Sequence, residues 1–137
     1  MIRKEELIGL AIRARDRAYA PYSHYAVGAA VLTEDGRIFS GCNIENASYG
    51  ATVCAERTAI FQAVNEGATK ITAIAIAGGL SGKEPVDYAF PCGICRQVMK
   101  EFGGDSMLIY VAKSMADYQE YTLAELLPHG FGGDSIQ

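Results

Sequence analysis

The 137-residue sequence predicts an α/β fold, a three-layer α/β/α sandwich with a central mixed sheet of about five strands. The chain begins with an amphipathic helical pattern and continues with two strand-like runs joined by a glycine turn. Helical and strand-like patterns then alternate, which is typical of a sheet covered by helices. Half of the residues are hydrophobic, enough to form one core, so we expect a single domain over residues 1–137.

The first half of the chain predicts a helix and a hairpin. Apolar residues three or four positions apart indicate a helix over residues 3–20, which Pro21 should end. Residues 26–32 and 37–41 are strand-like, and Gly36 between them suits a tight turn. These two strands should pair antiparallel.

The second half predicts helices over residues 52–65 and 93–102, with apolar strands over 71–77 and 107–112. Gly67 is placed to end the first of these helices. A strand at 118–122 and a short helix at 123–127 complete the predicted order. Strands and helices thus follow one another through this half of the chain.

Three cysteines indicate a metal site. Cys92 and Cys95 form a Cys-x2-Cys pair, and Cys54 would supply a third thiolate from elsewhere in the fold. Three protein ligands leave one zinc coordination position free for water, which indicates catalysis rather than a structural site. Both cysteine groups lie at predicted helix starts, where the helix dipole favours a thiolate.

The residues after Cys54 suit the same chemistry. Glu56, two residues further on, should project beside the free coordination position and could carry protons. Three thiolates on Zn²⁺ leave a net charge of minus one, which would weaken the acidification of water. Arg57 is the nearest cation in the sequence that could offset this charge.

Two other interpretations of the cysteines stay open at this point. The Cys-x2-Cys spacing alone is about as typical of a redox pair as of a metal site. A disulfide is less favoured, because nothing else in the chain indicates an oxidising compartment. A structural zinc module would bind zinc tightly and turn nothing over, and a redox protein would hold no stoichiometric metal.

Charge and hydropathy restrict the partners. The net charge is -4 and the chain has no basic run, which argues against binding to a nucleic-acid backbone. No signal-peptide core or membrane-length apolar run is present in the sequence. We therefore expect a cytoplasmic protein that acts on a small molecule.

Several motifs spread over nearly the whole chain closely resemble the small homotetrameric, zinc-dependent cytidine deaminases of the three-cysteine type. They are Pro21-Tyr22-Ser23, Val27-Gly28-Ala29-Ala30, Gly41-Cys42-Asn43-Ile44-Glu45-Asn46, Cys54-Ala55-Glu56-Arg57-Thr58-Ala59, Pro91-Cys92-Gly93-Ile94-Cys95-Arg96-Gln97 and Glu125-Leu126-Leu127-Pro128.

The resemblance implies a reaction. One Zn²⁺ per subunit on Cys54, Cys92 and Cys95 would hold a hydroxide that attacks C4 of cytidine or 2'-deoxycytidine. Glu56 would move the protons, so that uridine or 2'-deoxyuridine and ammonia are formed, as in pyrimidine salvage. The Ala55 backbone would help orient the base. A related deaminase acting on blasticidin S, on a nucleotide or on a nucleic-acid base is the rival within this class.

The resemblance also assigns the substrate contacts. Asn43 and Glu45 would bind the ribose, and the Glu45 carboxylate would repel a phosphate, which favours nucleosides over nucleotides. Tyr25 stands where relatives usually carry Phe and would pack against the pyrimidine. A homotetramer is implied, with active sites at subunit junctions, where Ala47, Tyr49 and Phe131 would contact a neighbouring subunit's site.

Overall fold

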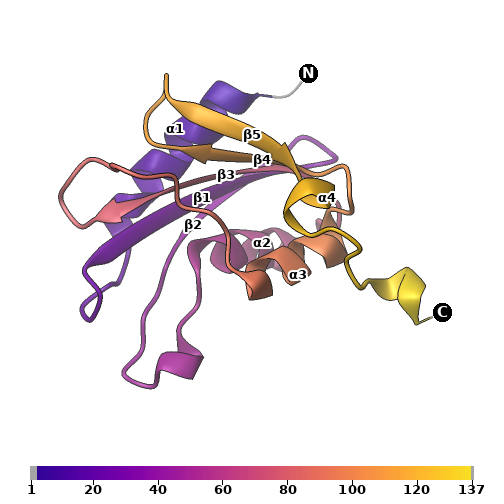
Figure 1. The fold of residues 1–137 in the computed structure, drawn as a ribbon, viewed down its shortest axis with the longest axis horizontal. Helices are drawn as coiled ribbons and strands as arrows, with labels where there is room; N and C mark the ends of the chain where they lie inside the picture. Colours follow the sequence, from indigo (N-terminus) through magenta and orange to yellow (C-terminus); the bar gives the residue numbers. More distant parts are fainter. Residues whose placement is uncertain (1–2, 137) are drawn as a thin grey trace.

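A five-stranded mixed sheet forms the centre of the computed structural model, which describes residues 3–136 (Figure 1). Met1, Ile2 and Gln137, which the predicted domain 1–137 includes, lie outside the described residues. The strands lie in the order β2-β1-β3-β4-β5, and only β3 and β4 run parallel. Their bounds are β1 (Tyr25–Thr33), β2 (Ile38–Cys42), β3 (Ile71–Leu80), β4 (Leu108–Ala112) and β5 (Tyr118–Thr122).

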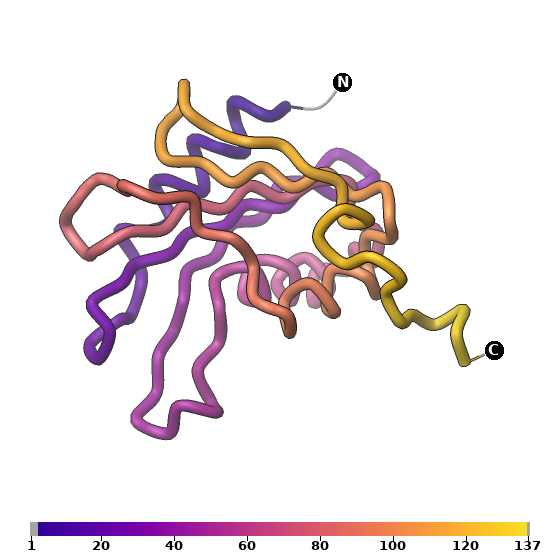
Figure 2. The backbone as a smooth tube through the Cα atoms, in the orientation of Figure 1, coloured from indigo at the N-terminus to yellow at the C-terminus, as the bar shows by residue number. Residues whose placement is uncertain are grey.

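Helices cover both faces of this sheet. Helix α1 (Lys4–Ala14) packs on one face, whereas α2 (Ala55–Asn65) and α3 (Gly93–Phe102) pack on the other (Figures 1 and 2). A short α4 (Leu123–Leu126) follows β5, with a Thr122–Glu125 capping box at its start. The predicted three-layer sandwich with a mixed sheet is therefore confirmed. Among residues 3–136, no helix is both long and apolar enough to span a bilayer.

Two glycines let the helices approach the sheet closely. A Cβ atom at Gly28 of β1 would lie 2.0 Å from the Ala11 carbonyl oxygen of α1. A Cβ atom at Gly41 of β2 would lie 2.6 Å from the Ala59 backbone nitrogen of α2. Neither distance is possible for a real side chain, so α1 and α2 sit where they do because these two strand positions have no Cβ.

Helix α1 ends at Ala14, so the prediction of a helix to residue 20 was wrong. A 3₁₀ turn follows at Arg15–Arg17. The Arg15 side chain donates hydrogen bonds to the carbonyls of Ala26, Leu80 and Lys83. Tyr19 then pairs with Ile44 as an isolated parallel bridge. The polypeptide leaves the helix because its next residues find backbone partners in the segment after β2.

Helix α2 begins at Ala55 rather than at the predicted residue 52, because Val53 forms an antiparallel bridge with Ile44. The segment between β2 and α2 thus folds back on itself and projects from the body as an arm (Figure 2). Strand β3 extends to Leu80, which pairs with Tyr25 of β1, and so exceeds the predicted 71–77. The other predicted elements agree with the structure to within one residue.

Candidate functional site

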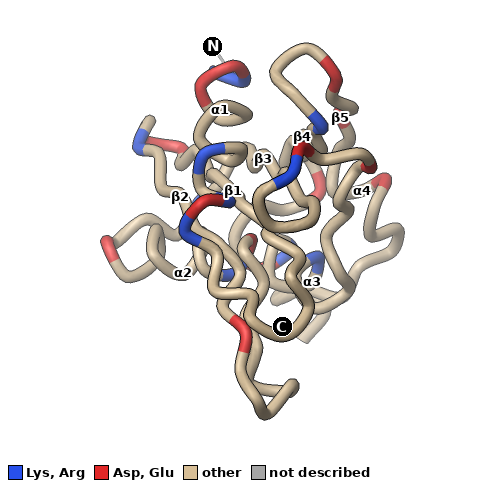
Figure 3. The backbone as a smooth tube through the Cα atoms, turned by 90° about the vertical axis from the view of Figure 1, so that its left-hand side faces the viewer, with Lys and Arg blue, Asp and Glu red and all other residues tan. Residues whose placement is uncertain are grey.

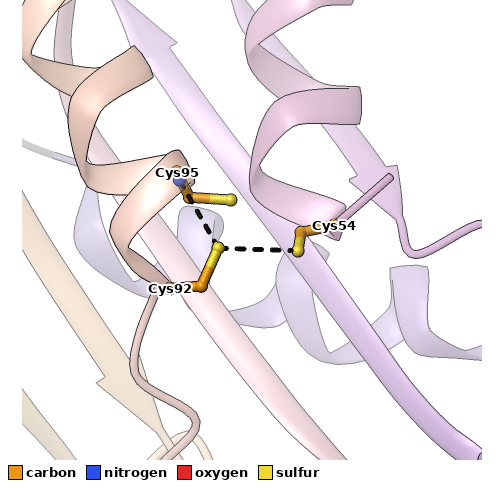
Figure 4. A group of neighbouring side chains, drawn as sticks. All are labelled: Cys54, Cys92 and Cys95. Atoms are coloured by element: carbon orange, nitrogen blue, oxygen red, sulfur yellow. Dashed lines mark hydrogen bonds between the residues drawn. The ribbon is translucent and has the colours of Figure 1, made fainter. Parts of the chain in front are cut away.

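The three cysteines meet at the N-termini of α2 and α3 (Figure 4). Their Sγ atoms all lie within 4.8 Å of one another. Cys54 is the N-cap residue of α2, and Cys92 is the N-cap residue of α3, whose sulfur accepts the Cys95 backbone N–H at 3.5 Å. Both predicted helix starts therefore carry their cysteines into one cluster, as the sequence indicated.

The cluster fits a zinc ion. The Sγ atoms of Cys54 and Cys92 are 3.8 Å apart. Tetrahedral zinc with Zn–S bonds of ~2.3 Å places neighbouring sulfurs at about that separation. No fourth His, Cys, Asp or Glu joins this cluster among the described residues. The donor set therefore matches a zinc site with one coordination position that the protein leaves free.

The surroundings of the sulfurs favour a thiolate. The Cys95 thiol, which hydrogen-bonds to Cys54, together with Arg57 lowers the pKa of Cys54 to about 5 against the opposing effect of burial. The pKa of Cys95 is raised, first by that same hydrogen bond and then by burial. A thiolate at Cys54 would thus lie beside the Arg57 guanidinium.

Arg57 lies where the sequence placed a compensating cation. Its Nη2 donates to Cys54 Sγ at 3.5 Å, and this contact is the main reason that the pKa of Arg57 is raised. Its Nε atom is buried and has no hydrogen-bond partner among residues 3–136. The guanidinium therefore contacts the sulfur cluster through Nη2, with its Nε atom buried.

A cavity of about 340 Å³ opens beside the sulfurs. The predicted residues Tyr25, Cys54, Ala55, Glu56 and Cys92 line it. Tyr25 enters from β1 and lies across β3 at Gly78, where an added Cβ would be 3.0 Å from the tyrosine ring. The absence of a side chain at Gly78 thus makes room for the aromatic wall of the cavity.

Glu56 is the charged residue of this wall. Its side chain is 4 % exposed, and desolvation raises its pKa to about 7, with the nearby Cys54 adding to the increase. A carboxyl group with a pKa near neutrality can both accept and donate a proton at physiological pH. Its place on the first turn of α2, two residues after a sulfur ligand, is the one that the sequence predicted.

Asn43 and Glu45 do not line the cavity of the sulfur cluster. Asn43 is 8 % exposed, and its amide bridges two residues of β1 that do line that cavity. Its Oδ1 accepts the Val27 N–H at 2.9 Å, and its Nδ2 donates to the Tyr25 carbonyl at 2.8 Å. In this chain Asn43 therefore fixes the backbone of the cavity wall.

Glu45 fastens the turn that precedes β1. Its carboxylate accepts hydrogen bonds from the backbone N–H groups of Tyr22 and Ser23 and from the Ser23 hydroxyl. The hydroxyl is the main reason that the pKa of Glu45 is lowered. The Ser23 oxygen in turn accepts the Tyr25 N–H at 3.0 Å. Glu45 also lines a second cavity of about 370 Å³, together with Tyr22 and Tyr49. Glu45 thus binds the turn directly and reaches Tyr25 only through Ser23.

Ala47, Tyr49 and Phe131 do not line the zinc cavity either. Tyr49 is 76 % exposed near the tip of the projecting arm, and Phe131 is 58 % exposed after α4. The Phe131 backbone carbonyl accepts a hydrogen bond from the Gln97 side chain of α3 at 2.8 Å. Both aromatic rings are therefore available to another molecule, and their predicted role at a neighbouring site stays a prediction.

Four residues of the cavity wall were not identified from the sequence: Val27, Ile76, Ala89 and Phe90. Val27 and Ile76 carry no chemical signal because they belong to apolar strands. Phe90 had a usable signal, since it directly precedes the Pro91-Cys92 motif and is 43 % exposed. A large aromatic residue beside a metal-binding motif could have been predicted to line the site.

Comparisons with known proteins agree with this geometry. Residues 1–112 match the family model described as the cytidine and deoxycytidylate deaminase zinc-binding region. The chain is 47% identical over 132 residues to a cytidine deaminase of Sporosarcina psychrophila, covering 96% of this chain and 93% of that one. It is also 47% identical over 133 residues to a cytidine deaminase of Halalkalibacterium halodurans, covering 97% of each chain.

A solved structure shows the same likeness. The crystal structure of a cytidine deaminase from Burkholderia pseudomallei superposes with a TM-score of 0.85 at 44% sequence identity. That superposition covers 96% of this chain and 100% of the other. The sulfur cluster, the extent of the family match and this superposition agree with one another. The chain belongs to the cytidine and deoxycytidylate deaminase family, whose members bind zinc.

Proposed function

We propose that this protein is a cytidine deaminase that converts cytidine or 2'-deoxycytidine and water into uridine or 2'-deoxyuridine and ammonia. The observation that carries the proposal is the Glu56 carboxyl group, 4 % exposed, in the wall of a cavity that Cys54 and Cys92 also line. A proton carrier beside a zinc site with a free position is what hydrolytic deamination requires. The sequence relatives named above are cytidine deaminases.

Each residue of the site has a proposed part in the reaction. Cys54, Cys92 and Cys95 hold the zinc, which when bound supplies a water molecule of lowered pKa. Glu56 would take one proton from the attacking water and deliver it to N3 of the pyrimidine. It would then carry the second proton of the same oxygen, now bonded to C4, to the amino group, which leaves as ammonia. A C4–O bond forms and the C4–N4 bond breaks. Arg57 offsets the negative charge of the thiolates.

The cavity wall accounts for binding of the base. Tyr25 from β1 and Phe90 from the loop before α3 supply aromatic surface to a cavity that Ala89 and Ile76 also line. A pyrimidine ring gains dispersion and stacking energy against such surfaces. The Ala55 backbone at the start of α2 is placed to orient the base.

We assign the sugar to Asn43 and Glu45. Asn43 keeps one amide N–H beyond the bond to Tyr25, and among residues 3–136 Oε2 of Glu45 accepts only the Ser23 hydroxyl. Each residue therefore retains hydrogen-bonding capacity for a ribose hydroxyl. The Glu45 carboxylate would repel a phosphate, so a nucleoside is the proposed substrate rather than a nucleotide. Basic and acidic residues are interspersed over the backbone in Figure 3, which supports a small-molecule substrate over a nucleic acid.

The assembly and cellular setting belong to the same proposal. We infer one domain over residues 1–137 and a homotetramer with active sites at subunit junctions. Ala47, Tyr49 and Phe131 would contact a neighbour's site, and the exposure of the two aromatic rings supports this. Pyrimidine salvage in the cytoplasm fits a nucleoside substrate and a reducing compartment that keeps cysteine thiols available to zinc.

One assay tests the activity. Purified protein with measured zinc content is incubated with cytidine, 2'-deoxycytidine, deoxycytidylate or blasticidin S, and the ultraviolet change of deamination is followed. We expect turnover of the two nucleosides. Faster turnover of blasticidin S or deoxycytidylate would show that the protein is a deaminase of that substrate instead. Zinc binding without any turnover would favour a structural zinc module.

Replacement of Glu56 tests the proton carrier. Glu56→Gln keeps the size and a hydrogen-bonding oxygen of the side chain but cannot take up a proton. We expect zinc content and binding of uridine to be retained, while kcat for cytidine falls by roughly 10² to 10⁴. A variant that keeps its kcat would exclude Glu56 from this role, whatever its effect on KM.

A further inference from the structure

The loop between β3 and α3 forms part of the zinc cavity without being a regular element. Residues 81–92 leave the end of β3, pass the β4–β5 hairpin and enter α3 at the cysteine pair (Figures 1 and 2). Ala89 and Phe90 of this loop line the cavity, and Cys92 ends the loop as a member of the sulfur cluster. The shape of the cavity therefore depends on what holds this loop in place.

Tyr88 fastens the loop to the turn between β4 and β5. Its hydroxyl donates to Asp117 Oδ1 at 2.5 Å, and Lys113 Nζ lies 4.5 Å from the centre of its ring. Asp117 and Lys113 are themselves joined, because the Lys113 N–H donates to the Asp117 carbonyl at 2.9 Å. The tyrosine thus binds a turn that is already closed.

A serine side chain fixes the backbone of the turn that carries the acceptor. The Asp117 backbone N–H donates to Ser114 Oγ at 3.1 Å, and the Ala116 N–H donates to the same oxygen at 3.3 Å. Because the backbone of Asp117 is fixed before the bond forms, only its side chain loses conformational freedom when the tyrosine binds to it. The hydrogen bond from Tyr88 can therefore transmit the position of the hairpin to the loop.

Two apolar contacts next to Tyr88 also touch the loop, but they are not directional enough to fix its position alone. The Phe90 ring packs edge-on against Tyr121 of β5, with ring centres 5.5 Å apart. Ala89 faces Gly78 of β3, where an added Cβ would lie 2.8 Å from the alanine methyl group. Such contacts tolerate sliding, whereas a hydrogen bond between fixed groups defines a distance and a direction.

We propose that Tyr88 is a positioning residue, whose hydrogen bond to Asp117 holds Ala89 and Phe90 in the wall of the substrate cavity. As a statement about substrate binding, this rests on the deamination proposed above. Tyr88 itself is not among the residues that line the cavity beside the sulfurs and Glu56. Its effect should therefore appear in binding of the nucleoside rather than in the proton transfers.

The test removes one hydroxyl group. In Tyr88→Phe we expect KM for cytidine and the dissociation constant of uridine to rise together by about threefold to tenfold, the effect of one lost hydrogen bond. We expect kcat to stay within about twofold of the wild type and zinc content to be unchanged. The NMR signals of the Ala89 methyl group, which lies at Gly78, and of the Phe90 ring, which packs on Tyr121, should shift.

Variants at the acceptor make the test specific. Asp117→Asn keeps a carbonyl oxygen that can accept the phenol proton and should leave KM near the wild-type value. Asp117→Ala should reproduce Tyr88→Phe, and the double variant should be no worse than either single one, because both changes remove the same bond. Tyr118→Phe is the matched control, since that tyrosine belongs to the same hairpin but packs with the core on the α1 side.

The outcomes separate this inference from the proposed activity. An unchanged KM and unchanged NMR signals of Ala89 and Phe90 in Tyr88→Phe would overturn it, and so would additive effects in the double variant. If the wild-type protein did not turn over cytidine, the proposed function would fail. The NMR signals of Ala89 and Phe90 in Tyr88→Phe would then still decide whether the Tyr88–Asp117 bond holds the loop.

Discussion

The polar residues around the zinc cavity each serve two partners. Glu56 is buried against Cys54, and Arg57 on the next position contacts the same sulfur. Asn43 holds the backbone of Tyr25 and Val27, and Glu45 holds the turn before them. Side chains that hold the wall of a cavity restrict one another, because a change at one displaces the other's target.

Replacement of Arg57 should weaken the zinc site. Arg57→Gln removes a charge that lies 3.5 Å from Cys54 Sγ, so the anionic cluster loses its nearest cation. We expect zinc affinity, measured by competition with a chelator, to fall by about tenfold to 100-fold, with a matching loss of activity at limiting zinc. Arg57→Lys should lose less, because it keeps the charge.

The control for this change is Arg3→Gln, which removes an arginine that pairs with Glu6 at the surface. It should leave both zinc affinity and activity unchanged, since exposed ion pairs contribute little. Equal zinc affinity in Arg57→Gln and the wild type would show that the helix N-termini alone offset the charge of the thiolates.

At the scale of elements, the sequence predicted those parts of the fold that local pattern determines. Helix α3 and strand β5 have the predicted bounds because apolar periodicity and flanking residues specify them. The predicted end of α1 was wrong, because the partners of Arg15 and Tyr19 lie far away in the chain. The start of α2 was misplaced for the same reason, since Val53 pairs with Ile44 across the arm.

The same distinction applies to the site. The cysteines and Glu56 could be predicted, because their spacing and their places at helix starts are local features. The hydrogen bonds of Asn43 to β1 and the wall residues Ala89 and Phe90 depend on packing between distant segments. A motif therefore identifies the chemistry of this site more completely than it identifies the shape of the cavity.

The contact between α1 and β1 gives an element-scale prediction. Gly28→Ala would place a Cβ atom 2.0 Å from the Ala11 carbonyl oxygen, so the helix must move away from the sheet. We expect the free energy of unfolding to fall by about 1–3 kcal/mol or more, the usual cost of overpacking a core. Urea denaturation followed by circular dichroism measures it.

Gly133→Ala is the matched control, because nothing lies within 4 Å of a Cβ atom at that position. Its midpoint should stay within the error of the wild type. If Gly28→Ala unfolded at the wild-type midpoint, the close approach of α1 would not depend on the absence of this Cβ.

At the scale of the whole molecule, the site joins parts of the chain that are distant in sequence. Cys54 on α2 and the pair on α3 come together at one end of two helices on the same face of the sheet, and Tyr25 reaches them from β1. The arm and the tail after α4 extend away from this centre (Figure 2). Exposed aromatic rings on both extensions leave apolar surface open to a neighbouring molecule, which the proposed homotetramer would cover.

A mixing experiment tests whether subunits complete one another's sites. Phe131→Ala alone should lower activity if the ring of one subunit contacts a neighbour's substrate. Glu56→Gln alone should be nearly inactive. Coexpression of the two variants would create sites that combine Glu56 from one chain with Phe131 from the other, so activity per Glu56-containing subunit should rise above that of Phe131→Ala alone. Complementation of this kind requires that the two residues act from different chains. If mixed assemblies of confirmed composition showed no such gain, Phe131 would act within its own subunit or not at all.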